Sequence, residues 1–216
     1  MYGNYVKPLP EKLGYRVIFG YYQRMSHPLI QRNHLKQAIL LGAYLYFSPA
    51  AAEVEIFTEG NSNLLAWKAQ HPGFSLQLIQ LLPDYVRAIY SARGLQKDVV
   101  ELMAGYCVFG TIIKNESSQE LAYRVADWRY VTADGRSHPV KTKTQWLEEW
   151  QKLGVAFRWS LLPDDQSFSP GDWSQGFTTL SLEPDTTFNL NYSWTLGGKS
   201  HAATIEALRC APATAP

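Results

Sequence analysis

Residues 188–208 read FNLNYSWTLGGKSHAATIEAL, and this stretch decides the fold. Its first seven residues alternate apolar and polar side chains, the period of a β-strand with one buried face. Gly197-Gly198 then predicts a turn, and His201–Leu208 follows as a second strand. The stretch therefore predicts two neighbouring strands of an antiparallel sheet.

Similar patterns predict about five more strands upstream. They are expected at Val54–Phe57, Val108–Ile113, Leu121–Tyr130, Val155–Leu161 and Phe177–Leu182. Within the third, the apolar parity shifts beyond Ala126, which predicts a bulge near Asp127. Asp134-Gly135 predicts a turn. About seven short strands separated by turn signals are typical of an antiparallel β-sandwich.

Helical periodicity interrupts the strands in two places. Between Ser75 and Tyr106 an apolar stripe recurs every three to four residues, and Lys97–Ala104 predicts a second helix, so we expect an αα-hairpin. Pro83 suits the first turn of the first helix and Gly94 its end. The stripe consists of Leu78, Leu82, Val86 and Ile89.

One further helix is predicted inside the sandwich. Thr142 and Gln145 have capping-box spacing, and Gly154 is placed to end the helix. Trp146 and Trp150 share one face of it.

A resemblance to a known class of domains follows from the turns. A strand ending in Asn115-x-Ser117, with Leu121 opening the next, and Phe168-x-Pro170-Gly171-Asp172 before another strand, resembles immunoglobulin-like domains of exported bacterial proteins. The resemblance covers roughly Cys107–Cys210 and implies a fold but no activity. We therefore expect a mainly β (α+β) chain: residues 53–106 form a short strand and the αα-hairpin, and residues 107–216 an immunoglobulin-like β-sandwich with one inserted helix.

Residues 25–52 have the pattern of a secretory signal. Arg32 and Lys36 precede an uncharged apolar run, Ala38–Phe47, and Ala50-Ala51-Ala52 fits an A-x-A cleavage site. A membrane span needs roughly 20 apolar residues, about twice this run. We expect cleavage before Glu53, a periplasmic or secreted protein, and no stable membrane insertion after cleavage. For residues 1–24 two explanations stay open: translation starts at Met25, or the signal has a long basic extension.

The net charge of the chain changes sign at the same point, between residues 52 and 53. Residues 1–52 hold six basic residues and one acidic, a net charge of +5, whereas the rest holds 14 basic and 18 acidic, a net charge of −4. A weakly acidic mature chain has no electrostatic footprint for nucleic acid.

Cys107 and Cys210 are the two cysteines, and both lie in the part expected to be exported. In an oxidising compartment an even pair predicts one disulfide. The alternative is a soft-metal site, in which Met103 and the histidines join Cys107 to hold copper.

Catalytic motifs are absent from the sequence: it has no P-loop, dinucleotide, G-x-S-x-G or H-E-x-x-H pattern. We therefore expect no catalysis and no cofactor. Three places are candidates for a partner surface: Arg87 and Tyr90 on the first helix, Asp127 and Arg129 in a polar–aromatic cluster, and Trp173 after a turn. For the first, a structural alternative is that the hairpin merely covers a sheet edge.

These patterns favour an exported, non-catalytic binding or accessory protein that contacts an envelope or secreted protein. The alternative is an envelope accessory protein that binds a small ligand or copper. An enzyme with dispersed catalytic residues ranks third.

Overall fold

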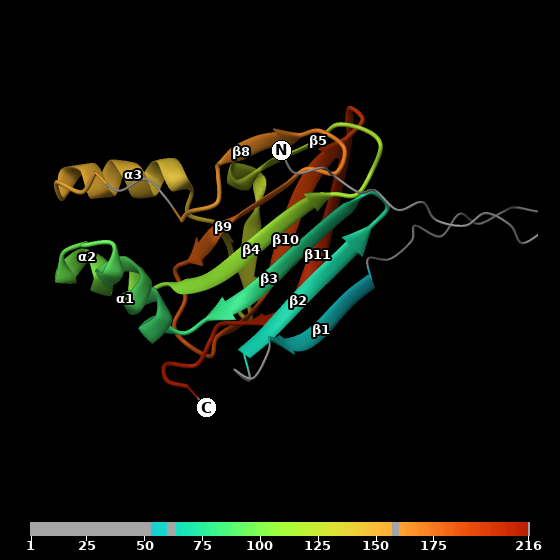
Figure 1. Ribbon diagram of the computed structural model, residues 1–216. Coiled ribbons are helices and arrows are strands. Elements are labelled where there is room, and N and C mark those ends of the chain that lie inside the picture. The colour runs from blue at the N-terminus through green and yellow to red at the C-terminus, as the bar shows by residue number, and fades with distance from the viewer. Residues whose placement is uncertain (1–52, 60–63, 157–159, 216) are drawn as a thin grey trace, which may run out of the picture. The chain divides into compact units, whose positions relative to one another are not determined.

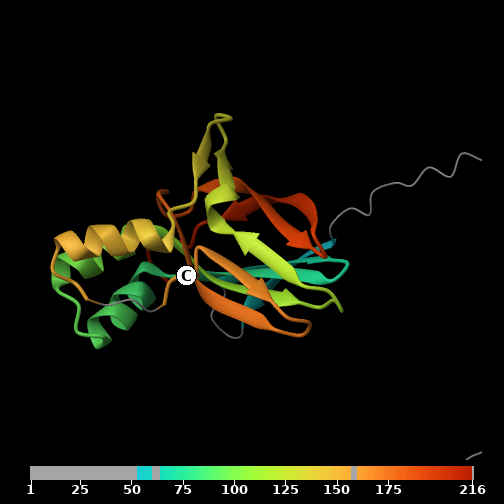
Figure 2. The same cartoon turned by 90° about the horizontal axis from the view of Figure 1, so that it is seen from above.

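The computed structural model describes residues 53–59, 64–156 and 160–215. They form two antiparallel β-sheets, and three helices gather at one end of the sheets (Figures 1 and 2). The predicted signal and the residues before it lie outside this part of the chain, so their predictions stay untested.

The first sheet has the strand order β1-β2-β3-β4-β9. Its strands are β1 (Glu53–Glu59), β2 (Leu64–His71), β3 (Phe74–Leu81), β4 (Cys107–Asn115) and β9 (Trp173–Leu180). Every neighbouring pair is antiparallel. The sheet therefore joins strands from both sides of Cys107, and the sandwich includes β1–β3, which the predicted division at Cys107 leaves outside it.

The second sheet has the order β7-β6-β10-β5-β8, and the last strand, β11, pairs with β10. Its strands are β5 (Leu121–Arg124), β6 (Arg129–Thr132), β7 (Ser137–Pro139), β8 (Asp165–Phe168), β10 (Thr187–Leu196) and β11 (Lys199–Arg209). The predicted hairpin of residues 188–208 is confirmed as β10 and β11.

Aromatic side chains fill the space between the sheets. Phe74 of the first sheet stacks on Trp194 of the second, with ring centroids 4.4 Å apart. Trp67 and Trp128 are completely buried in the same core. Because large aromatic side chains bury the most apolar area, these contacts supply much of the free energy that holds the sheets together.

The helices α1 (Pro83–Ala92), α2 (Lys97–Ala104) and α3 (Lys143–Lys152) bury a second core. Figures 1 and 2 both place α3 beside α1 and α2, although α3 is far from them in the sequence. The residues of this second core are Val86, Tyr90, Val99, Val100, Met103, Ala104, Val108, Trp146, Trp150 and Leu161.

Two helix predictions are confirmed. The second helix spans the predicted residues, Lys97–Ala104. At the start of α3, the Thr142 hydroxyl accepts from the Gln145 backbone N–H at 3.3 Å, and the Gln145 side chain accepts from the Thr142 N–H at 2.9 Å. This is the predicted capping box.

The first helix begins later than predicted, and the predicted stripe is wrong. Leu78 lies in β3 and points into the main core, and Leu82 is the residue that precedes the helix. Pro83 does occupy the first turn, and Gly94 follows the helix with a φ of +79°. The helix therefore buries a different face, on which Val86 and Tyr90 are the buried residues.

Other strand predictions need smaller corrections. A 3₁₀ turn, η1 (Val125–Asp127), takes the place of the predicted bulge near Asp127. Of the predicted strand Val155–Leu161, residues 157–159 lie outside the described part, Val155 is not in a strand, and Leu161 forms a single bridge to Phe177. The Asp134-Gly135 turn is present between β6 and β7.

Candidate functional site

Tyr90, predicted to face a partner, is completely buried. It lies one turn after Val86 on the covered face of α1, and its hydroxyl lies 2.8 Å from that of Ser160. Burial raises the pKa of the Tyr90 hydroxyl to about 12. The prediction failed because it placed the start of the helix too early in the sequence. The residues assigned to the apolar face of the helix were therefore the wrong ones.

Arg87 does lie at the surface, with 40% of its side chain exposed. Its guanidinium bonds Glu101 of α2 at 3.0 Å and Asp84 of its own helix at 2.9 Å. The hydrogen bond to Glu101, and then that to Asp84, raises its pKa further above the ordinary value. Arg87 therefore links α1 to α2 while remaining accessible.

Asp127 is the last residue of the 3₁₀ turn η1, and Arg129 is the first residue of β6 in the second sheet. Asp127 pairs with Arg124 at 2.9 Å, and Arg129 donates to the backbone carbonyls of Ala126 and Trp128. Trp128 itself is buried, and its indole N–H donates to the Ser193 carbonyl at 3.2 Å. Asp127 and Arg129 thus mainly stabilise the turn between β5 and β6.

Trp173 lies in β9 of the first sheet and is 56% exposed. The five residues predicted for a partner surface are consequently distributed over both sheets and the helical end. They do not form one continuous surface.

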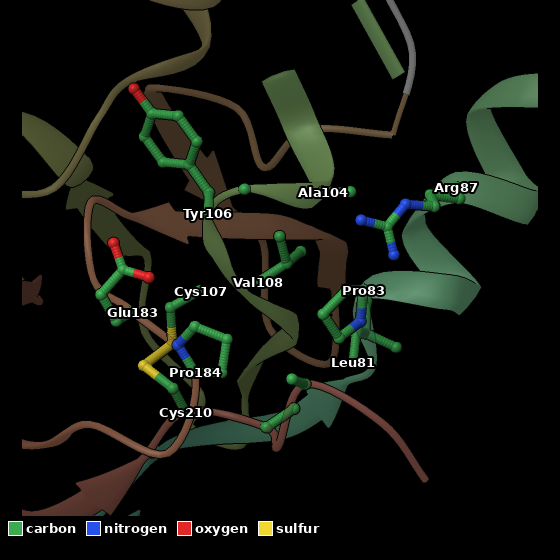
Figure 3. Close-up of a pocket in the computed structure, with 13 residues that line it drawn as sticks. Leu81, Pro83, Arg87, Ala104, Tyr106, Cys107, Val108, Glu183, Pro184 and Cys210 are labelled. Atoms are coloured by element: carbon green, nitrogen blue, oxygen red, sulfur yellow. A yellow bond between two sulfur atoms is a disulfide. The ribbon is translucent and has the colours of Figure 1, made fainter. Parts of the chain in front are cut away.

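A pocket of about 230 Å³ lies where the helices meet the sandwich (Figure 3). We call it the junction pocket. Elements distant in the sequence form its walls: the end of β3, α1, the end of α2, the start of β4, the β9–β10 connection and the C-terminal segment. The residues that define it here are Leu81, Pro83, Arg87, Gly105, Tyr106, Val108, Glu183, Pro184 and the two cysteines.

The predicted disulfide is confirmed and forms one wall of this pocket. Cys107 at the start of β4 and Cys210 after β11 are joined, with Cα atoms 5.4 Å apart. Gln80 fixes the same corner, because its buried amide donates to the carbonyls of Arg209 and Cys210 at 2.8 and 3.3 Å. This wall is therefore held covalently and by hydrogen bonds.

Tyr106 forms another wall, and its position is fixed from behind. The Lys141 ammonium donates to the Tyr106 hydroxyl at 3.2 Å and lies 3.5 Å from the centre of the Trp146 ring. Glu149 of α3 forms an ion pair with the same ammonium. Cation–π contact and ion pairing together anchor Tyr106 to α3.

Two opposite charges stand on facing walls of the junction pocket. The Arg87 guanidinium extends from α1 on one side, and the Glu183 carboxylate lies on the opposite side (Figure 3). Apolar side chains and the disulfide lie between them. Such a pocket can bind a side chain that has both an apolar and a charged part.

Sequence reasoning missed Tyr106, Glu183 and Pro184. The predicted disulfide was the one available signal, because it requires the neighbours of Cys107 and Cys210 to lie close together. Nothing in the pattern of residues 181–186 indicates that this connection folds back beside Tyr106.

The residues of the soft-metal hypothesis are not brought together. Cys107 has no free thiolate because it is bonded to Cys210, and Met103 is buried in the helical core. His138 stacks on Tyr130, and His71 contacts Tyr192 in the main core. Within residues 53–59, 64–156 and 160–215, no three potential metal ligands of the His, Cys, Asp and Glu types cluster.

Among the helices of the described part of the chain, none is long and apolar enough to cross a membrane. No protein-family model matches the sequence, and no curated protein matches it either. Arguments about function therefore start from the junction pocket.

Proposed function

We propose that this protein is an exported, non-catalytic binding or accessory protein that acts through contacts with another protein. The observation that carries the proposal is the junction pocket, whose walls are held in place by the disulfide, Gln80 and the Lys141–Tyr106 contact. Preformed pockets that receive one anchor residue are typical of protein-binding surfaces.

The size of the pocket favours a protein partner over a free small molecule. Its volume of about 230 Å³ lies below the roughly 300–1,000 Å³ of sites that enclose drug-sized ligands. One side chain of a partner fills such a space, and the exposed residues around it extend the contact.

Export is supported by two independent features of the chain. The signal-like pattern of residues 25–52 precedes the folded part, and a disulfide is the bond expected of an oxidising compartment.

The immunoglobulin-like classification and the αα-hairpin belong to the same proposal. They are supported by the two antiparallel sheets and by the consecutive helices α1 and α2, which Arg87 and Glu101 connect.

A pull-down from envelope extracts with the mature domain tests the proposal. Gly105 lines the pocket, and its φ lies outside the left-handed region that favours glycine. A Cβ at this position would lie 3.4 and 3.5 Å from its nearest atoms, so a side chain is tolerated. Gly105→Leu should remove a specific partner, whereas Gly105→Ala, the matched control, should keep it. A partner that binds both variants equally contradicts the use of this pocket.

Metal analysis of protein purified from the periplasm distinguishes the proposed function from the alternative, an accessory protein that binds a small ligand or copper. Stoichiometric copper on the purified protein would favour the ligand-binding accessory role. Metal-free protein that retains its partner would favour the proposal.

A further inference from the structure

The apolar part of the junction pocket suits an aliphatic chain. Leu81, Pro83, Val108 and Pro184 line it together with the disulfide. A long side chain such as that of lysine or arginine buries its methylene groups on surfaces of this kind and keeps its charged end at the rim. The pocket therefore accommodates such a side chain without burying the charge.

The charges around the pocket favour a positive group. Asp84 and Glu101 both bond Arg87, so two carboxylates already neutralise this one guanidinium. Glu183 on the opposite wall has no ion pair within the residues that the structure describes. Of the two charged side chains that line the pocket, Arg87 is thus already paired with two carboxylates outside the lining, whereas Glu183 is available to pair with a positive group.

The pairing of Arg87 with Asp84 and Glu101 argues against an anionic ligand. A carboxylate approaching Arg87 would have to compete with Asp84 and Glu101 for its N–H groups. It would also meet the repulsion of these two side chains at short distance. Arg87 therefore does not make the pocket an anion site.

The chain itself shows how a lysine is held beside Tyr106. On one side of this residue, Lys141 lies between aromatic rings and is paired with Glu149. Glu183 and Tyr106 both line the pocket, on the side opposite Arg87 (Figure 3). The pocket thus offers a carboxylate and an aromatic residue among the side chains that line it.

We infer that the junction pocket receives a lysine or arginine side chain from an extended segment of the partner. The stem lies against the apolar wall and the disulfide, and the charged end pairs with Glu183. This inference rests on the proposed function and adds the chemistry of the partner. Because Glu183 is exposed, binding weakens as the salt concentration rises.

A peptide library displayed on phage tests the inference. Random twelve-residue peptides, about the length of a short recognition segment, are selected on the mature domain and then screened on Gly105→Leu. Peptides lost on Gly105→Leu but kept on Gly105→Ala bind at the pocket. Among these we expect a lysine or arginine next to apolar residues.

A synthetic peptide from this set then measures the pairing with Glu183. Glu183→Gln should raise its Kd about tenfold, the effect of losing one charged hydrogen bond. Replacing the peptide's lysine with norleucine should weaken binding to the wild type by a similar factor and change binding to Glu183→Gln little. Glu206→Gln, an exposed carboxylate on β11, is the control and should leave the Kd unchanged.

The outcomes separate the two proposals. If pocket-dependent peptides lack basic residues, or if Glu183→Gln binds them as the wild type does, the inference about the partner's chemistry is wrong and the proposed function stands. If selection yields no peptide that Gly105→Leu loses, both are overturned.

Discussion

The imidazole Nε2 of His71 and the hydroxyl of Tyr192 lie 2.7 Å apart, and this contact joins the two sheets at the end of β2. The His71 ring also lies 4.5 Å from that of Trp194, which stacks on His201 at 5.3 Å. Burial, and then the charge of His201, lower the pKa of His71 below its ordinary value of 6.5. The folded state therefore favours the neutral form of the half-buried His71.

The stability of the protein should fall as the pH drops below about 6.5. The pKa of His71 is lower in the folded state than in the unfolded state, so the unfolded state binds the proton first. The free energy of unfolding is then lost progressively until the pH has passed below the folded-state pKa. Urea unfolding at a series of pH values between about 8 and about 5 measures this slope.

Variants of the histidines test which residue causes this dependence of the free energy of unfolding on pH. His71→Gln should flatten it, and His201→Gln should reduce it by removing the second cause of the shift. His138→Gln, on β7 beside Tyr130, is the control and should keep the wild-type slope. Equal slopes for the wild type and His71→Gln would show that other groups govern the acid range.

Two tyrosines of α1 should respond differently to truncation. Tyr90→Ala should cost about 3–5 kcal/mol, because it removes a large aromatic side chain from the helical core. Tyr85→Ala, on the exposed face of the same helix, should leave the melting temperature almost unchanged. Thermal unfolding followed by circular dichroism measures both, and similar losses would contradict the placement of the helix.

Asn115 should be more important for stability than its position at the end of β4 implies. Its buried side-chain amide donates to the carbonyls of Gln119, Phe168 and Ser169, at 2.7 to 3.2 Å, and its oxygen accepts from Ser117. Asn115→Ala removes all of these hydrogen bonds from a buried position and should cost at least about 2 kcal/mol.

An exposed asparagine provides the control for that prediction. Asn191 on β10 accepts one hydrogen bond from Thr204 at 2.8 Å, and Asn191→Ala should have little effect. Urea unfolding compares the two variants. If Asn115→Ala is equally mild, water or a rearranged turn replaces the lost bonds.

Elements whose signals depend only on neighbouring residues in the chain could be predicted from the sequence. The Thr142/Gln145 capping box marks the start of α3, and the alternation of residues 188–194 fixes β10, because each requires only neighbours in the chain. The segment 74–82 was ambiguous, since Leu78 and Leu82 fit a helical period. The polar Gln80, buried where it bonds the C-terminal segment, breaks the alternation that would have revealed β3.

The candidate site was less predictable because its walls come from six separate elements. Cys107 and Cys210 were found from the composition of the chain, and Arg87 from its place on a helix. The position of Glu183 depends on how the β9–β10 connection packs against Tyr106, which no local pattern encodes. Tertiary packing decided this part of the site.

Export should produce a mature chain that begins at Glu53. The expectation follows from Ala50-Ala51-Ala52 after the apolar run of residues 38–47. Mass spectrometry of the protein recovered from the periplasm or medium of a native-like host identifies the terminus. Exported protein that retains Met1 or Met25 would contradict cleavage at this site.

Loss of the disulfide should lower stability and weaken the junction pocket together. Cys107 and Cys210 are 103 residues apart, and closing so long a loop stabilises a fold by about 2–5 kcal/mol. The double variant Cys107→Ser, Cys210→Ser should still fold, because both aromatic cores remain. It should melt at a lower temperature and bind a pocket-dependent peptide more weakly, because the bond forms one wall.

Thiol titration links this effect to the bond itself. Denatured but unreduced wild-type protein should show no reactive thiols, and after reduction it should show two, one for each cysteine in the sequence. Reduced wild type and the double variant should then unfold at similar urea concentrations. Two reactive thiols before reduction would show that the cysteines are free, and Cys107 would again be available as a metal ligand.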